Sequence, residues 1–236
     1  MQPAASGVTR HPHLDQAQPA GRLRVDLHSH TMWSGDSTST PEEIIEGVEA
    51  SGLDVLCITD HNAVAGAQRL VDELPCRVVI GEEVRTHVGE IIGLFLSERI
   101  PGGLQPAAVC RRIRDQGGLV YLPHPFDPMR NGLRADVIDA LVADGLVDAI
   151  EGRNAKTSLE HLNQQAVDYA AANGLPAGAG SDAHVAEAIG AAYVEMADFD
   201  GPTSFLARLA EGSLVGHHWD APRAWRPRIV PSTKND

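Results

Sequence analysis

Residues 55–61 read VLCITDH, four apolar residues followed by a threonine, an aspartate and a histidine. A short apolar run with no polar alternation is typical of a strand that is buried on both faces. Such strands occur in parallel sheets, and in a closed barrel their carboxyl ends open onto one face. Asp60 and His61 are costly to bury, so we expect at least one of them at that face.

The same pattern recurs along the chain, with segments of helical period between the apolar runs. Thr40 followed by Pro41 is a typical helix start. This alternation predicts a parallel α/β fold, and six or seven units favour a barrel over an open sheet. Residues 88–96 are expected to add an extended excursion. The predicted strands are 23–27, 55–59, 77–80, 119–122, 147–150 and 175–179, and the predicted helices are 41–50, 63–73, 106–116, 135–143 and 158–173.

The composition of the chain restricts the class of protein. The 236 residues, of which 43% are hydrophobic, suffice for one core. No apolar run approaches the roughly 20 residues of a membrane span, and no secretory signal is visible, so we expect a soluble, cytoplasmic protein with no membrane partner. The net charge of −13 disfavours a broad nucleic-acid surface. It suits bound cations, although ordinary acidic solubility explains it equally well.

The two ends of the chain differ in composition from the middle. Residues 1–20 are expected to form a disordered N-terminal arm, and residues 219–236, rich in proline and basic residues, a C-terminal tail. This leaves residues 21–218 as a single barrel domain. Three widely spaced cysteines fit neither a disulfide framework nor a metal site, so we expect them in the core.

Each apolar run is followed by side chains that bind metals. His28 and His30 lie two residues apart at a strand end, so both imidazoles point to one side, where they can chelate one ion. His124 lies between two prolines, in a segment expected to be extended. Because the strand ends converge, we expect these groups to meet at a shared rim. The candidates are His28, His30, Asp36, Asp60, His61, Glu82, Glu83, His124, Glu151, Asp182 and His184.

Several of these residues have an ordinary alternative explanation. Asp36 fits a turn, and Asp60 with His61 fits a helix start. Glu82 and Glu83 place two like charges together, so one should resist ionising unless a cation neutralises them. A carboxylate that bridges two metals would relieve this repulsion.

Other histidines carry less weight. The motif His11-Pro12-His13 repeats the spacing of residues 28–30, but we interpret it as part of the disordered arm. His87 stays open between a surface residue and a substrate contact. The histidines expected at the surface are His161, His217 and His218.

Five motifs, in this order, resemble those of the PHP (polymerase and histidinol phosphatase) superfamily: His28-Ser-His30, Thr59-Asp-His61, Gly81-Glu-Glu83, Pro123-His-Pro125 and Gly180-Ser-Asp-Ala-His184. The resemblance covers residues from about 23 to about 215. It implies a distorted (β/α)7 barrel with the metal site at the carboxyl ends of the strands. It also implies two or three divalent ions (zinc, manganese or iron) and hydrolysis of phosphoesters.

Carried over by position, the resemblance also implies a ligand set. Some relatives have a further histidine after the fifth strand, where this chain has Glu151; Glu151 could take its place, and Asn154 could contact substrate. The implied ligands are His28, His30, Glu83 and Asp182 for one metal, Glu83 and His124 for a second, and Asp36, His61 and His184 for a third.

The expected reaction is in-line attack of a metal-activated hydroxide on phosphorus. Arg85, Arg153 and Lys156 are placed to hold the phosphate, although each could equally be a solvated loop charge. His184 or Asp60 would protonate the leaving group.

A small phosphorylated substrate, a monoester or a nucleotide, fits a compact acidic chain. The alternatives are an exonuclease or oligonucleotide phosphodiesterase that takes short nucleic acid as substrate, a non-catalytic metal-stabilised accessory module, and an amide hydrolase. The sequence leaves the metal and the oligomeric state open.

Overall fold

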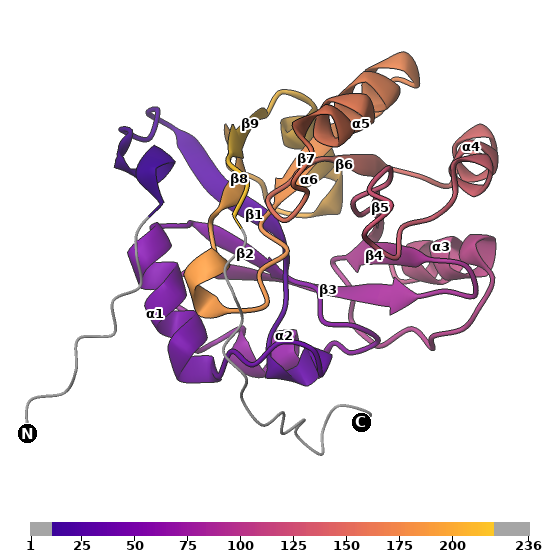
Figure 1. Ribbon diagram of the computed structural model, residues 1–236. Helices are drawn as coiled ribbons and strands as arrows, with labels where there is room; N and C mark the ends of the chain where they lie inside the picture. Colours follow the sequence, from indigo (N-terminus) through magenta and orange to yellow (C-terminus); the bar gives the residue numbers. More distant parts are fainter. Residues whose placement is uncertain (1–10, 220–236) are drawn as a thin grey trace, which may run out of the picture.

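The computed structural model describes residues 11–219, and in this range nine strands form one mixed sheet (Figure 1). The strand order is β7-β6-β5-β4-β3-β2-β1-β8-β9, and the sheet curls into a nearly closed barrel. The strands are β1 (Arg22–Ser29), β2 (Val55–Ile58), β3 (Arg77–Arg85), β4 (Glu90–Leu94), β5 (Leu119–Leu122), β6 (Ala149–Asn154), β7 (Ala177–Gly180), β8 (Ala192–Ala197) and β9 (Ser213–Gly216).

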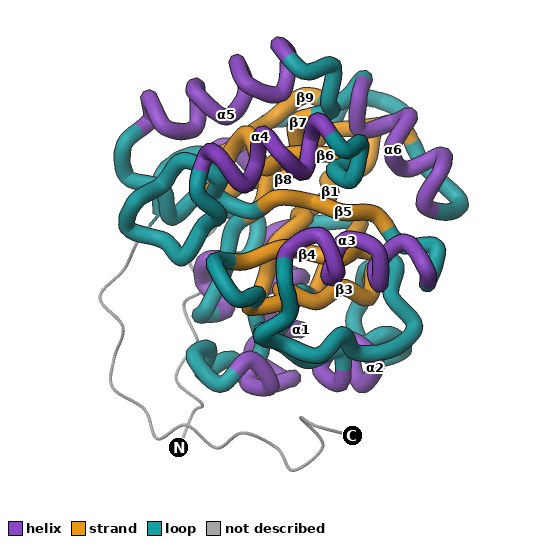
Figure 2. The backbone as a smooth tube through the Cα atoms, turned by 90° about the vertical axis from the view of Figure 1, so that its right-hand side faces the viewer, coloured by secondary structure: helices purple, strands orange, loops and turns teal. Residues whose placement is uncertain are grey.

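Helices lie on the outside of the strands, as Figure 2 shows for α3 to α6. Within residues 11–219, none of the helices has both the length and the apolar character needed to cross a bilayer. The α-helices are α1 (Pro41–Ser51), α2 (Ala65–Leu70), α3 (Pro106–Asp115), α4 (Ala135–Ala143), α5 (Glu160–Ala172) and α6 (Pro202–Ala210), and short 3-10 helices occupy Pro12–Asp15, Met32–Ser34 and Ala186–Ala188.

The barrel closes where the segment after β7 meets the end of β1. The Asp182 amide donates to the His28 carbonyl over 2.7 Å, and the His30 amide donates to the Ala183 carbonyl over 2.9 Å. A parallel bridge joins Ser29 to Ala183 between these two bonds. The first and last of the predicted parallel strands therefore end side by side.

All six predicted strands and all five predicted helices are present. Thr40 caps α1 with a complete capping box, its hydroxyl accepting from the Glu43 amide while the Glu43 carboxylate accepts from the Thr40 amide. The cysteines are free, and Cys57 and Cys110 are buried, as expected of core residues.

The predicted distorted α/β barrel is confirmed, but its sheet also contains antiparallel pairs. The predicted excursion at residues 88–96 is β4, which pairs antiparallel with both β3 and β5. Only a tight turn, closed by the Thr86 amide on the Gly89 carbonyl, joins β3 to β4, and a parallel neighbour would need a crossover of a dozen or more residues. The unpredicted strand β8 also pairs antiparallel, with β1 and with β9.

The structure also differs from the predicted N-terminal arm. His11 and Leu14 are packed against the body: His11 is 4% exposed, and Leu14 belongs to a core cluster with residues of α1 and of the 3-10 helix Ala186–Ala188, whereas residues 15–20 are exposed. The rings of His13 and His217 meet with their Nδ1 atoms 2.9 Å apart, so the motif at residues 11–13 and the half-buried His217 form a cluster that joins distant parts of the chain. The other predicted arm and tail residues, 1–10 and 220–236, lie outside the described range.

Strand β7 has the sequence Ala-Gly-Ala-Gly because its neighbours approach its backbone closely. A Cβ atom on Gly180 would lie 2.4 Å from the His28 Cβ and 2.7 Å from the Glu151 Oε1. These contacts are shorter than van der Waals separation, so a methyl group at residue 180 would force β1 and β6 away from β7.

We expect Gly180→Ala to lower the free energy of unfolding by about 1–3 kcal/mol, the usual effect of overpacking. Gly201→Ala is the matched control, because no atom lies within 4 Å of the position its Cβ would take. Thermal unfolding of both variants followed by circular dichroism checks this. Equal melting temperatures in the two would contradict the close approach at residue 180.

Candidate metal centre

The eight side chains predicted as metal ligands converge at one end of the barrel. All are buried except Asp36, which is 25% exposed. Their nitrogen and oxygen atoms form groups in which every ligand atom lies within 4.8 Å of the others. The groups are His28, His30 and Asp182; His28, Glu83 and His124; His30, Asp36, His61 and His184; and His61, Glu83 and Glu90.

Four of these ligand atoms have the spacing of a tetrahedral site. The Nε2 atoms of His28 and His30 are 3.0 Å apart, and each lies 3.4 Å from the Glu83 Oε2. The Asp182 Oδ1 lies 3.5 Å from the His30 Nε2 and 3.9 Å from the His28 Nε2. Tetrahedral bonds of 2.0–2.1 Å place ligand atoms roughly 3.3 Å apart, so these five distances are close to those that ligands of one divalent ion would have.

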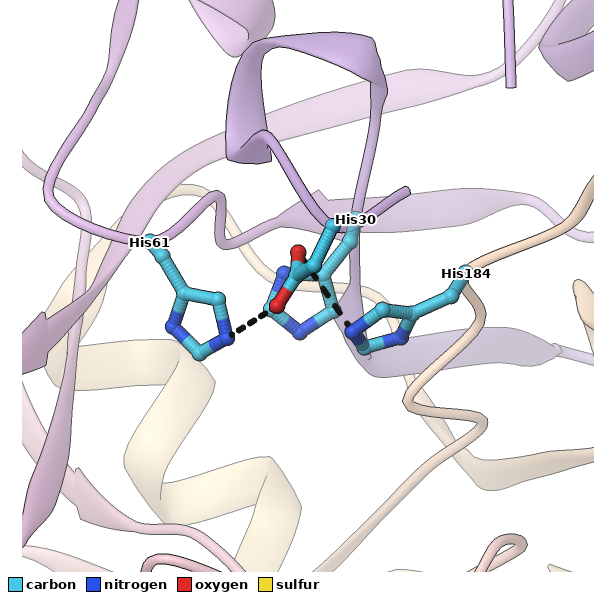
Figure 3. Close-up of side chains that lie close together, drawn as sticks. His30, His61 and His184 are labelled. Carbon is cyan, nitrogen blue, oxygen red and sulfur yellow. Dashed lines mark ion pairs between the residues drawn. The ribbon is translucent and has the colours of Figure 1, made fainter. Parts of the chain in front are cut away.

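A second concentration of donors surrounds the carboxylate of Asp36. Figure 3 shows the ring of His30 between the rings of His61 and His184. The His61 Nε2 lies 3.1 Å from one Asp36 oxygen and the His184 Nε2 lies 3.6 Å from the other. Burial opposes ionisation of Asp36, but hydrogen bonds from His184 and His61 lower its pKa below the usual range. Asp36 therefore lies ionised among imidazoles, as a candidate ligand would.

Glu83 connects the groups. Its Oε1 lies 3.2 Å from the His124 Nε2, and its Oε2 lies 3.2 Å from the His61 Nδ1 as well as near the first pair of histidines. Burial favours the neutral acid, but the surrounding imidazoles, His61 first, keep the pKa of Glu83 well below its usual value. The two oxygens face different imidazoles, so Glu83 could contribute a donor to more than one of the groups.

The neighbouring acid points the other way, as alternation along a strand requires. The Glu82 Oε2 accepts from the Ile100 amide over 2.7 Å, and burial raises the pKa of Glu82 to about 7. The two carboxyl groups therefore point to opposite sides of the strand, which limits the expected repulsion. The raised pKa of Glu82 favours its neutral form, and the lowered pKa of Glu83 favours its ionised form.

Sequence reasoning missed Glu90. Its Oε1 lies 3.7 Å from the His61 Nδ1, and its Oε2 lies 3.9 Å from the His124 Nε2. The sequence did contain a signal: Glu90 stands at the start of an apolar run that comes soon after the strand of Glu83. It was not used, because residues 88–96 were interpreted as an excursion rather than as a strand of the barrel.

The backbone is strained at two of the candidate ligands. His124 and Asp182 have φ angles of 31° and 50°, in the left-handed region that residues other than glycine rarely adopt. The expectation that His124 is extended was therefore wrong. Its amide donates to the Glu151 Oε2 over 2.7 Å, which holds the residue in this conformation. Such strain is characteristic of functional sites.

The carboxylate of Glu151 forms hydrogen bonds that position the candidate ligands. Besides the His124 amide, its carboxylate accepts from the His28 Nδ1 over 3.1 Å and from the Asn154 Nδ2 over 2.9 Å. Asn154 also donates to Asp182 over 3.3 Å. Glu151 and Asn154 are both 1% exposed, and this arrangement orients His28 with its Nε2 toward the other ligands.

The structure does not place every predicted residue at the site. Asp60 accepts from the Thr31 amide and hydroxyl over 2.6 and 2.7 Å, and burial raises its pKa to about 7. It does not line the cavity, so of the two acids proposed for the leaving group only His184 does. Arg153 pairs with Glu160 and likewise stays outside the cavity.

The other predicted basic residues lie beside the ligands. The Lys156 Nζ lies 3.2 Å from the Asp182 Oδ1 and 2.8 Å from the His184 Nδ1. Arg85 donates to Asp36 over 3.1 Å and to Glu90 over 3.2 Å, at the solvent side of the site. His87 and His161 are exposed, and His87 does not line the cavity.

A cavity of about 250 Å³ opens over the ligands. Three of its residues, on the loop after β5, were not predicted, because loop residues carry no periodic signal. The lining comprises Asp36, His61, Glu83, Glu90, His124, Met129, Arg130, Asn131, Lys156, Asp182 and His184.

Loss of a ligand should remove bound metal. We expect His28→Ala and Asp182→Ala, purified without chelator, to retain less than half of the metal of the unchanged protein, because each removes one donor of the tetrahedral group. His161→Ala, on the exposed face of α5, is the control and should bind metal normally. Elemental analysis with circular dichroism on the same samples checks this; full metal content in both site variants would contradict the assignment.

Comparisons with known proteins identify the family. The PHP domain model matches residues 26–101, and the PHP-associated model matches residues 160–214. Uncharacterized protein MJ1587 of Methanocaldococcus jannaschii is 40% identical over 137 residues, 52% of this chain and 80% of that protein.

Two solved structures share the fold. One, from Bacteroides vulgatus, is a two-domain protein containing a predicted PHP-like metal-dependent phosphoesterase; its TM-score is 0.68 at 18% identity, over 89% of this chain and 69% of that one. The other is the lesion-specific endonuclease PfuEndoQ from Pyrococcus furiosus, with a TM-score of 0.64 at 15% identity, over 82% of this chain and 57% of that one. The chain, with its histidines and acids gathered at the rim of a barrel, belongs to the PHP domain family.

Proposed function

We propose that the protein is a metal-dependent phosphoesterase that hydrolyses a small phosphate ester, a monoester or a nucleotide. Membership of the family of PHP-like metal-dependent phosphoesterases supports hydrolysis of phosphoester bonds. The observation that carries the proposal is that the donor atoms of His28, His30 and Asp182, with Glu83 close to both imidazoles, lie beside a buried lysine. Donors for cations and a donor for an anion thus meet at one small cavity.

The residues fit two or three divalent ions. His28, His30, Glu83 and Asp182 would hold one, Glu83 and His124 a second, and Asp36, His61 and His184 a third, with Glu90 as a further oxygen donor. Bound ions supply a water molecule of lowered pKa and neutralise charge on the phosphoryl oxygens. Imidazole and carboxylate ligands suit zinc, manganese and iron alike.

The chain's own residues orient the ester. Lys156 is 8% exposed and lines the cavity, so its ammonium is placed to donate to a phosphoryl oxygen in a site that excludes much of the water. Arg85, at the open side, adds a second cation. His184 lines the same cavity, and we assign it to protonate the leaving-group oxygen.

The size and charge of the molecule favour a small substrate. The cavity of about 250 Å³ is below the usual range for drug-sized ligands, roughly 300–1,000 Å³. The net charge of −13 opposes binding along an extended phosphate backbone.

A short nucleic-acid end is the second candidate substrate. Endonuclease Q, solved in complex with a 27-mer duplex bearing an abasic lesion, shares the fold with a TM-score of 0.62 over 80% of this chain and 57% of that one. A non-catalytic accessory role is a third candidate, because part of this chain is similar to a small part of a much larger enzyme. An error-prone DNA polymerase of Mycobacterium tuberculosis is 41% identical over 78 residues, which are 7% of its length.

Hydrolysis assays on protein purified without chelator separate these candidates. We expect release of phosphate from small monoesters or 3′,5′-bisphosphorylated nucleotides, little cleavage of oligonucleotides, and loss of activity after chelation with recovery on adding metal. Faster turnover of oligonucleotides would favour the nuclease, and metal content without any hydrolysis would favour the accessory role. Full activity in metal-stripped protein would rule out the proposed chemistry.

Lys156→Met should lower kcat/KM by about 100-fold, the usual effect of losing one donor to the reacting oxygens. Arg153→Met is the matched control, since Arg153 follows the same strand region but pairs with Glu160 outside the cavity. Steady-state kinetics with metal content measured on each sample checks this. An unchanged rate in the Lys156 variant would refute its role.

A further inference from the structure

Arg130 differs in its partners from Lys156, which also lines the cavity, and from Arg85, which lies near the ligands but does not line the cavity. Arg85 pairs with Asp36 and Glu90, and Lys156 pairs with Asp182. In the described part of the chain, Arg130 makes no ion pair with a carboxylate, although it lines a cavity that four carboxylates also line. Its positive charge is therefore available to a ligand.

The guanidinium of Arg130 also retains unused donors. Its Nη2 donates to the Lys156 carbonyl over 3.2 Å, which places it beside the loop that carries the buried lysine. Its Nε is buried and has no hydrogen-bond partner within residues 11–219. A buried N–H without a partner is unfavourable, and an oxygen atom of a bound ligand would satisfy it.

Several hydrogen bonds hold the loop that carries Arg130. Asp127, 8% exposed, accepts from the Met129 amide over 2.9 Å and from the Thr157 hydroxyl over 2.9 Å. The Arg130 amide donates to the Asp127 carbonyl over 3.1 Å, and the Asp127 amide donates to the His124 carbonyl over 3.2 Å. These bonds tie the loop both to a candidate metal ligand and to the segment after β6, so the guanidinium is held in place.

We propose that Arg130 is a specificity-determining residue that binds the non-bridging oxygens of the substrate's phosphoryl group. The inference rests on the proposed function for the identity of the ligand. A guanidinium presents two parallel N–H groups that match two phosphoryl oxygens, which a lysine does not. Arg130 thus selects a tetrahedral oxyanion over the planar carbonyl of an amide, a substrate that metal-activated water could also attack.

The test uses inorganic phosphate as a probe, because its binding does not require turnover. Isothermal titration of metal-loaded protein should show Arg130→Met binding phosphate about 10- to 100-fold more weakly than the unchanged protein, the loss expected for hydrogen bonds to a charged group. Metal content should be unchanged, because Arg130 belongs to none of the ligand groups. Arg134→Met is the control, since Arg134 is 74% exposed and pairs with Asp136.

Kinetics on a hydrolysed ester provide a second readout. Arg130→Met should raise KM more than it lowers kcat, Arg130→Lys should recover only part of the affinity, and added guanidinium should improve Arg130→Ala but not the unchanged protein. Recovery of full affinity by lysine would overturn the bidentate contact.

Failure of this inference is distinguishable from failure of the proposed function. Phosphate affinity equal in Arg130→Met and in the unchanged protein overturns the inference even where hydrolysis is normal, and so does an absence of phosphate binding to the unchanged protein. Arg130-dependent phosphate binding without hydrolysis of any ester supports the inference and refutes the proposed function. If Arg130→Met and Arg130→Lys both lose metal, Arg130 has a structural role and the inference is wrong.

Discussion

The contacts of one carboxylate, that of Glu83, organise the candidate metal centre. Its two oxygens lie within 3.4 Å of imidazole nitrogens from four histidines, three on one side and one on the other. Of those histidines, His28 and His30 share one motif at the end of β1, and His61 and His124 follow β2 and β5. The strands bring these acids and imidazoles together at a buried rim. Buried carboxylates are unfavourable without nearby positive charge, and bound cations would supply it.

The barrel provides the rigidity that such a centre needs. Hydrogen bonds between the end of β1 and residues 182–183 fix His28 and Asp182 relative to each other, and Gly180 permits the close approach. Asp26 reinforces this junction: its buried carboxylate accepts from the amides of His28, Ser181 and Gly190, while burial raises its pKa to about 6. Ligands on strand ends with this support are held more firmly than ligands on free loops.

Much of this was predictable because strands buried on both faces have continuous apolar sequences, as residues 55–58 do. The acids and histidines that follow such runs are costly to bury, which indicates that they have a function. What was not predictable depends on direction. The antiparallel direction of β4 depends on the four-residue turn before Glu90. The side chains of Glu83 and Asp60 point in different directions because each carboxylate contacts different neighbours. Arg130 lies in a loop whose conformation depends on hydrogen bonds to Asp127, which no periodicity reveals.

The left-handed backbone at His124 and Asp182 has a consequence for descendants of this fold. Glycine or asparagine would occupy these two positions with less conformational penalty, so a copy that no longer binds metal would become more stable by exchanging them. If the two residues hold metal, as proposed, that role is what would favour histidine and aspartate there. In a set of duplicated genes, the residues at 124 and 182 would therefore separate working copies from those that survive as scaffolds.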